Sequence, residues 1–130
     1  MASAPLQRGG TRAPPPPDQL ASFYKLVDKK VVAAALSRFA RNVELSSQAA
    51  LHAEALFGDD SLVVADLRCS ESCSLQNLAC EASGAEQQAL ARRSWGVMQS
   101  VVNLLLRRLE ANTLLPGTAR EEELDYEVHA

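Results

Sequence analysis

Aromatic residues are scarce in this chain, and it contains no long apolar run. Three Phe, two Tyr and one Trp are the only aromatic residues among 130. Strands favour aromatic and β-branched residues, so this composition argues against a sheet and suits packing of helix against helix. The longest apolar run, residues 101–106, contains Asn103 and ends at two arginines, whereas a bilayer-spanning helix needs about 20 apolar residues. We therefore expect an all-α protein without a membrane span.

Basic residues and histidines are also few. The 13 Lys and Arg stand against 16 Asp and Glu, which gives a net charge of −3. Nonspecific binding to nucleic acid depends largely on basic side chains, so no nucleic-acid partner is expected. With only His52 and His129, no catalytic triad can be assembled with any specificity. P-loop, dinucleotide-binding and zincin motifs are absent as well, so we expect neither an enzyme nor a cofactor.

The N-terminal segment lacks the apolar stretch of a secretory signal peptide. Three cysteines without an export signal favour a reducing compartment, and the expected location is the cytoplasm. Residues 1–17 carry Arg8 and Arg12 and no acidic residue, so import into an organelle is the alternative. The glycine pair and the run of four prolines at residues 14–17 predict a disordered, proline-rich tail.

Apolar residues at three- and four-residue steps predict helix over most of residues 18–115. We expect Asp18 to cap a first helix that begins near Gln19. The helical pattern then continues to Phe57. Only the internal repeat described below argues for a break in it, near residues 41–43.

Two further long helices are expected over residues 62–82 and 85–111. Side-chain oxygens at residues 59–61 can cap the first, and Ser83 with Glu86 matches a capping box for the second. The second carries two adjacent apolar stripes, which indicates a helix that touches neighbours on two sides. One stripe is Ala91, Trp95, Met98, Val102, Leu105 and Leu109, and the other is Leu90, Val97, Val101 and Leu104.

Residues 116–130 form an acidic C-terminal segment. Pro116 and Gly117 end the preceding helix, and Thr118 with Glu121 matches another capping box, so a short helix over residues 119–128 is expected. Its acidic residues predict a solvated tail or a short capping helix that lies outside the core. The chain thus divides into a tail (1–17), a helical-repeat domain (18–115) and this acidic segment.

Four positions in the predicted helices recur 42 residues later. The pairs are Leu36 with Leu78, Ala40 with Ala82, Ala49 with Ala91, and Leu56 with Met98. A fixed period of this size is typical of stacked, antiparallel helical hairpins. About two such hairpins fit this chain. Because these stacks present extended surfaces to other proteins, we expect a non-enzymatic protein–protein interaction module, whose partner is another protein or peptide.

A family resemblance supports this interpretation. In residues 49–65 a helix ends in an apolar pair followed by Gly58 and Asp59, and a polar loop leads into the next helix. With Asn77, Leu78 and Ala79 downstream, this resembles a tetratricopeptide repeat of the kinesin light chain type, whose period is also 42. The resemblance covers about residues 30–100. It implies stacked helix pairs with a concave face that grips a peptide or a helix of a partner.

In such arrays the first helix of each repeat lines the groove. The resemblance therefore places the partner-binding groove on the polar and small residues opposite the leucine-rich face. These residues are Arg38, Arg41, Asp66, Cys69, Cys73, Gln76 and Asn77.

Two alternatives remain open. In the first, the chain is a self-associating helical bundle whose stripes around Trp95 and Val97 form a homo-oligomeric core. In the second, it is a thiol-based metal or redox-sensing protein, because Cys69, Cys73 and Cys80 project from one helix face. Cys80 lies about 10 Å further along the axis than Cys73, too far to share a zinc ion whose bonds to sulfur are about 2.3 Å. Small apolar contact residues are the simpler interpretation of these cysteines.

Overall fold

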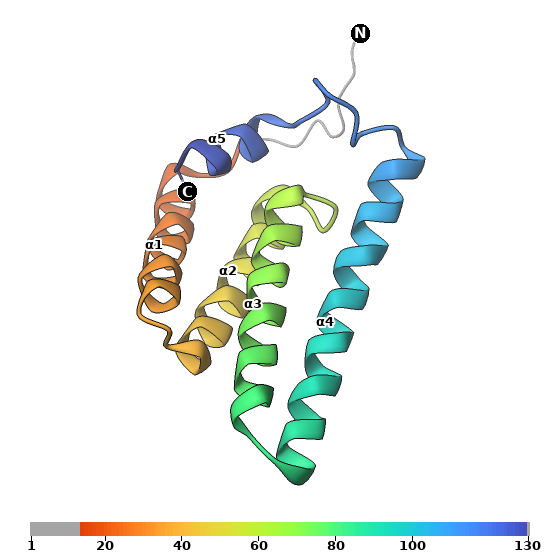
Figure 1. Cartoon of the computed structure of the whole chain (residues 1–130). Helices are drawn as coiled ribbons and strands as arrows, with labels where there is room; N and C mark the ends of the chain where they lie inside the picture. The colour runs from red at the N-terminus through yellow and green to blue at the C-terminus, as the bar shows by residue number, and fades with distance from the viewer. Residues whose placement is uncertain (1–13, 130) are drawn as a thin grey trace, which may run out of the picture.

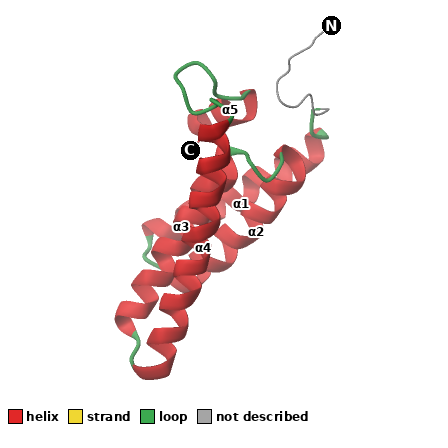
Figure 2. Ribbon diagram, turned by 90° about the vertical axis from the view of Figure 1, so that its right-hand side faces the viewer, coloured by secondary structure: helices red, strands yellow, loops and turns green. Residues whose placement is uncertain are grey.

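The computed structural model describes residues 14–129, which form five α-helices and no strand (Figure 1). The helices are α1 (Pro17–Ala35), α2 (Phe39–Phe57), α3 (Leu62–Glu81), α4 (Gly84–Glu110) and α5 (Glu121–His129). The four long helices pack antiparallel, each against the next along the chain, and α5 lies across one end of them (Figure 2). The predicted all-α class and antiparallel packing are confirmed. Of the tail expected over residues 1–17, residues 1–13 lie outside the described residues.

The first helix begins two residues earlier than expected. Pro17 occupies its first position, where a proline costs no hydrogen bond and already has the helical φ. Asp18 is therefore not the N-cap, and Pro16 makes no side-chain cap at that position. The carboxylate of Asp18 instead lies in the first turn, where it interacts favourably with the helix dipole.

The break in the first helical stretch lies at residues 36–38, so the prediction of a break at residues 41–43 is wrong. Ser37 adopts a left-handed conformation with φ of 54°. The backbone N–H of Arg38 donates to Ala33 O at 2.9 Å, and that of Ser37 donates to Ala34 O at 3.0 Å. These two bonds form a Schellman motif, which usually has glycine at the left-handed position. Because a serine occupies the left-handed position here, no glycine marks the end of this helix in the sequence.

The start of α3 follows the prediction, and the start of α4 does not. Ser61 Oγ accepts a hydrogen bond from Val63 N at 3.2 Å and so caps α3. Ser83 makes no side-chain cap on α4, although Glu86 stands three residues later. The residue after Ser83, Gly84, has φ of 60°, which is not the helical value that a capping box needs at that position.

Helix α3 lies between α2 and α4 and is buried on more than one side. Its contact with α4 is close because Ser72 and Ser94 meet there, with 2.8 Å between their hydroxyl oxygens. The apolar core gathers side chains from all five helices. It consists of Phe23, Val27, Ala49, Ala50, Ala53, Phe57, Val63, Val64, Ala65, Leu67, Val101, Leu104 and Tyr126.

The acidic C-terminal helix contributes to the core, contrary to the expectation of a solvated segment. Tyr126 of α5 is buried, and its ring centroid lies 6.4 Å from that of Phe23 in α1. Glu123 is buried as well, and its carboxylate accepts a bond from the backbone N–H of Arg120 at 3.0 Å, which caps α5. The expected capping box of Thr118 and Glu121 is therefore wrong, and the Thr118 hydroxyl donates to Leu115 O instead. Among the described residues, no helix combines the length and apolarity that a membrane crossing requires.

Candidate interaction surface

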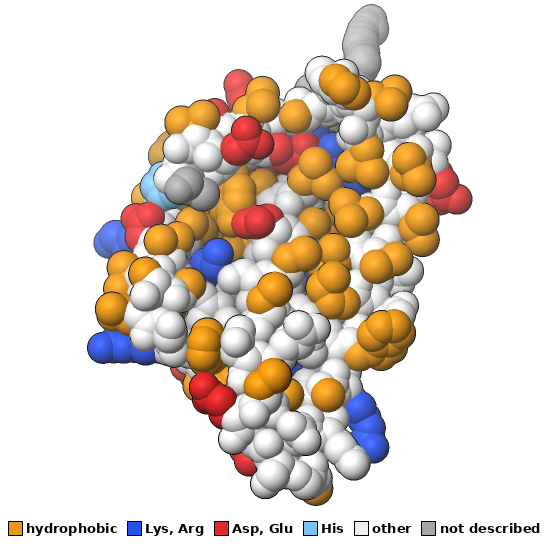
Figure 3. Space-filling model, in the orientation of Figure 1, with side chains coloured by type: hydrophobic (Ala, Val, Ile, Leu, Met, Phe, Trp, Pro, Cys, Tyr) orange, Lys and Arg blue, Asp and Glu red, His pale blue; other side chains and the backbone are white. Residues whose placement is uncertain are grey.

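Large apolar side chains are exposed along one side of α4. Figure 3 shows hydrophobic side chains gathered over this part of the molecule. The five residues are Trp95 (68% exposed), Val102, Leu105, Leu106 and Leu109, and we call them the α4 stripe. Apolar side chains of a surface helix normally face the core, so a stripe that faces solvent is a feature to be explained.

Three of the stripe residues lie on nearly one line along the helix, and Leu105 and Leu106 flank this line. At 100° per residue, Trp95 and Leu109 lie within about 20° of Val102 around the axis, and they are about 21 Å apart along it. The side of α4 that faces α3 is a different one and carries the buried residues Val101 and Leu104. Of the two apolar stripes in the sequence, the one with Val101 packs inside the protein. The one with Trp95 lies open to solvent.

The other exposed side of α4 lines a cavity of about 500 Å³ between α2, α3 and α4. Arg93 and Arg107 reach it from α4, and Arg68 reaches it from α3. The charged groups of this cavity are already paired. Arg68 binds Glu71 at 2.7 Å, and Arg107 lies 3.3 Å from Asp59. The cavity therefore offers little uncompensated charge to a ligand.

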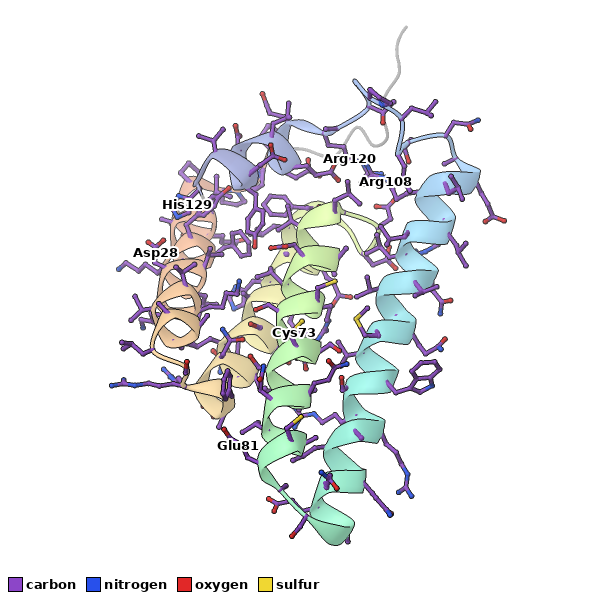
Figure 4. The ribbon with its side chains drawn as sticks, in the orientation of Figure 1. Asp28, Cys73, Glu81, Arg108, Arg120 and His129 are labelled. Carbon is purple, nitrogen blue, oxygen red and sulfur yellow. The ribbon has the colours of Figure 1, made fainter. Side chains whose placement is uncertain are left out.

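The α4 stripe adjoins the predicted groove residues of α3. Arg68 lines the cavity, whereas the exposed residues Cys73 and Gln76 lie about 140° and about 80° from it around the axis of α3. Their side of α3 is the one on which α4 shows its stripe, and Figure 4 shows Cys73 at the middle of α3. Cys69 is half-buried and packs against the apolar core, as does Met98 of α4. We call the α4 stripe together with Cys69, Cys73 and Gln76 the α3/α4 surface.

Asp66 and Asn77 are engaged within the protein. The hydroxyl of Tyr126 donates to Asp66 Oδ2 at 2.6 Å, so α5 occupies the position where we expected a partner. Burial raises the pKa of Tyr126, and the hydrogen bond to Asp66 raises it further. Asn77 Nδ2 donates to the carbonyl oxygen of Cys73 at 3.0 Å. Both residues remain exposed, but their side chains already have hydrogen-bond partners within the protein.

The two predicted arginines lie elsewhere. Arg38 and Arg41 line a second cavity of about 310 Å³ between α1 and α2, beside Asp28 and Val32. Arg41 also lies 3.3 Å from Glu44. No residue of α3 lines this cavity. The structure thus divides the predicted groove residues between two places.

The three thiols are free. Burial raises the pKa of Cys69, and the nearby Asp66 and Cys73 raise it further. A raised pKa disfavours the thiolate, which is the reactive form of cysteine. Within residues 14–129, no three His, Cys, Asp or Glu side chains come together as a metal site. At the α3/α4 surface the neutral thiol of Cys69 acts as a small apolar group.

A buried ion pair fixes the C-terminal end of α4, which carries the end of the stripe. Arg108 is 1% exposed, and its Nη1 donates to Glu123 Oε2 at 2.6 Å. The same carboxylate oxygen accepts from Leu62 N at 2.9 Å, so Glu123 joins the starts of α3 and α5 to the end of α4. Burial alone raises the pKa of Glu123. The hydrogen bonds from Arg108 and from two backbone N–H groups outweigh this and hold the pKa below its usual value.

The polar residues that the sequence predicts as a partner-binding groove are not the main feature of the α3/α4 surface. Trp95, Val102, Leu105 and Leu109 were recognised as one of two stripes and were interpreted as contacts with a neighbouring helix. The sequence signal for this exposed surface is the second stripe itself, because α3 is the main helix that packs against α4 among the described residues. Comparison of the chain with protein-family models, curated proteins and solved structures gives no match.

Proposed function

We propose that this chain is a non-enzymatic protein-binding module whose α3/α4 surface docks against an apolar helix of another polypeptide. One observation carries the proposal: the α4 stripe is exposed along about four turns of the helix, while a different side of α4 carries the buried residues Val101 and Leu104. Large exposed apolar patches on soluble proteins typically mark sites of interaction.

The chemistry of the stripe favours a protein partner. Removing a Leu, Val or Trp side chain from water contributes about 1.5–3 kcal/mol, and Trp is enriched among the residues that dominate binding energy at interfaces. All five stripe residues are apolar, so the stripe itself provides no group that could bind a phosphate or a metal ion. A helix that lays its own apolar face along α4 would cover the stripe.

The arrangement of the helices supports the same proposal. We interpret the row α1 to α4 as two tetratricopeptide-like hairpins. In a repeat array each unit packs against the next, so the last unit exposes the side on which another would stack. The stripe lies on the last long helix. A partner helix that binds there would continue the row.

The remaining properties fit a protein-binding role inside a reducing compartment, for which we propose the cytoplasm. All three cysteines are unpaired in the structure. A net charge of −3 gives no support for binding to nucleic acid.

The test is capture of protein ligands by a tagged chain in native lysate to which untagged copies of the same chain have been added. Val102→Arg places a charge in the middle of the stripe, at a position that is partly exposed and can accommodate it. Leu51→Arg is the matched control, because Leu51 is an exposed leucine of α2 outside the stripe. We expect Val102→Arg to lose the ligand and Leu51→Arg to retain it, with unchanged helical content in both. Equal capture by all three proteins, or no capture by any, would overturn the proposal.

A further inference from the structure

We propose that the polypeptide bound at the α3/α4 surface is a second copy of this chain, with the two α4 helices packed antiparallel across a two-fold axis at Val102. This inference rests on the proposed function and names the partner. Three features of α4 support it.

The first is that the stripe is complementary to itself. Trp95 and Leu109 each stand seven residues from Val102, on nearly the same side of the helix. A two-fold axis through Val102 therefore places Trp95 on Leu109 of the second copy, and the reverse contact forms at the other end. Val102 meets its own equivalent between them. These three residues thus find partners on an identical surface, as an isologous interface requires.

The second is the charge along the solvent-side edge of the stripe. Arg92 and Glu110 both lie about 80° from Val102 around the helix axis, on the same side. Both are exposed, and neither makes an ion pair within residues 14–129. They are about 27 Å apart along α4, so they cannot reach each other within one chain.

In the antiparallel pair, Arg92 of each copy lies beside Glu110 of the other, which gives two symmetric ion pairs. Gln99 and Asn103, on the same edge, face each other in the same way. A parallel pair would instead put Arg92 beside Arg92 and Glu110 beside Glu110. The charges thus select the antiparallel arrangement, which also aligns the helix dipoles favourably.

The third is what the dimer adds to the fold. Two hairpins are fewer than the three or more repeats that arrays commonly need for stability. A second copy that packs against α4 extends the row of helices from four to eight and covers the exposed stripe on α4. The contact is a single helix pair with flanking α3 residues, at the small end of specific interfaces, so we expect a dissociation constant on the order of 10 μM.

The experiment is sedimentation velocity of the full chain from roughly 1 to 300 μM, a range that brackets the expected constant. We expect a reversible monomer–dimer equilibrium for the unmodified chain and a monomer throughout for Val102→Arg. Leu51→Arg is expected to dimerise like the unmodified chain. Circular dichroism and thermal melting of each variant show whether it remains folded.

A charge exchange tests the geometry. Arg92→Glu and Glu110→Arg each replace two attractions by two repulsions, and each should weaken the dimer by about 10-fold. The double variant restores both ion pairs with reversed sign and should recover the original constant to within about 3-fold. Since the two residues cannot meet within one chain, recovery requires a second copy in antiparallel orientation.

The outcomes separate the two proposals. An unmodified chain that stays monomeric, or a dimer that does not respond to the charge exchange, overturns the inference. If the chain is monomeric but captures a different protein in a manner that Val102→Arg abolishes, the dimer is wrong and the proposed function stands. If it is monomeric and captures nothing, both are wrong.

Discussion

Arg108 and Glu123 form an ion pair at 2.6 Å that is almost completely shielded from solvent, with side chains 1% and 5% exposed. The pair joins the last turn of α4 to the first turn of α5. Arg108 also donates to the carbonyl oxygens of Asp60 and Thr113, at 2.9 and 3.0 Å. These bonds hold the loop between α2 and α3 and the loop between α4 and α5 in place. The C-terminal end of the α4 stripe is held in place by these contacts.

Removal of the Glu123 carboxylate should strongly destabilise the protein. Glu123→Ala leaves the Arg108 guanidinium buried without its counter-charge, and loss of one partner of a buried pair typically costs about 3–5 kcal/mol. Urea denaturation measures the loss. Glu121→Ala in the same turn of α5 is the control, since Glu121 is exposed, and it should change the free energy of unfolding by no more than about 0.5 kcal/mol. Similar small effects of the two substitutions would contradict the described role of the ion pair.

The pair of Asp60 and Arg120 predicts a pH-dependent contribution. Arg120 donates two hydrogen bonds to the Asp60 carboxylate, at 2.8 and 2.9 Å. These bonds lower the pKa of Asp60 by more than burial raises it. A carboxyl group with a folded pKa below its unfolded value of about 3.9 stabilises the fold above that pH, and the contribution is lost as the pH falls through the folded pKa.

Asp60→Asn should therefore destabilise the protein at pH 7 by about 1 kcal/mol, because the pair is partly exposed. The difference from the unmodified protein should shrink below about pH 4. Urea midpoints at pH 7, 5 and 3 provide the measurement. Glu127→Gln, at an exposed position of α5, serves as the control and should change the free energy of unfolding at pH 7 by no more than about 0.5 kcal/mol. A cost of Asp60→Asn that increases in acid would show that the sign assigned here is wrong.

Asn42 is the centre of a buried polar network that joins α1, α2 and α3. Its Nδ2 donates to Lys30 O at 3.1 Å. Its Oδ1 accepts from Ser46, Ser70 and Ser74 at 3.1, 3.2 and 2.8 Å. Each buried group that loses its partner typically costs about 1–3 kcal/mol.

Asn42→Ala should consequently lower the free energy of unfolding by about 2–4 kcal/mol. Asn77→Ala is the matched control, because the amide of Asn77 bonds only to Cys73 O on the exposed side of α3, and its removal should cost less than about 0.5 kcal/mol. Thermal melts followed by circular dichroism can rank the two variants. Equal melting temperatures for the two would be incompatible with this network.

Both tyrosines should resist ionisation while the protein is folded. Burial raises the pKa of Tyr126 and that of Tyr24, and nearby carboxylates (Asp66 and Asp125, respectively) raise them further. A phenol whose folded pKa exceeds the unfolded value of about 10 stabilises the fold fully below that pH, and the stabilisation is lost as the pH rises through the folded pKa. Phenolate absorbance should therefore appear above pH 10 and together with the loss of helical circular dichroism. Full ionisation near pH 10 with the helices intact would contradict the burial of Tyr126 against Asp66.

The sequence predicted the four long helices well and their boundaries unevenly. The break at Ser37 was placed about five residues too late, because the left-handed residue that ends α1 is a serine and local composition gives no signal. The C-terminal helix was predicted, but its burial was not. Glu123 is buried because Arg108 and Leu62 N, which are distant in sequence, satisfy its carboxylate. Partners of that kind cannot be read from local charge, which marks the segment simply as acidic.

Only part of the candidate surface could be predicted from the sequence, and the reason is physical. The two stripes of α4 were visible at helical spacing, but a pattern cannot show which of them an intramolecular helix covers. Tertiary packing decides this, and Ser72 and Ser94 bring α3 onto the side with Val101. The stripe with Trp95 is left bare as a consequence.

Acrylamide quenching of Trp95 fluorescence tests the central claim most directly. Trp95 is the single tryptophan of the chain and is 68% exposed, so the signal reports on the N-terminal end of the α4 stripe alone. We expect quenching to decrease as the chain associates through this surface at rising concentration. In Val102→Arg, quenching should stay at the level of the dilute chain at every concentration. Association that leaves the quenching of Trp95 unchanged would show that the chain does not associate through the α4 stripe.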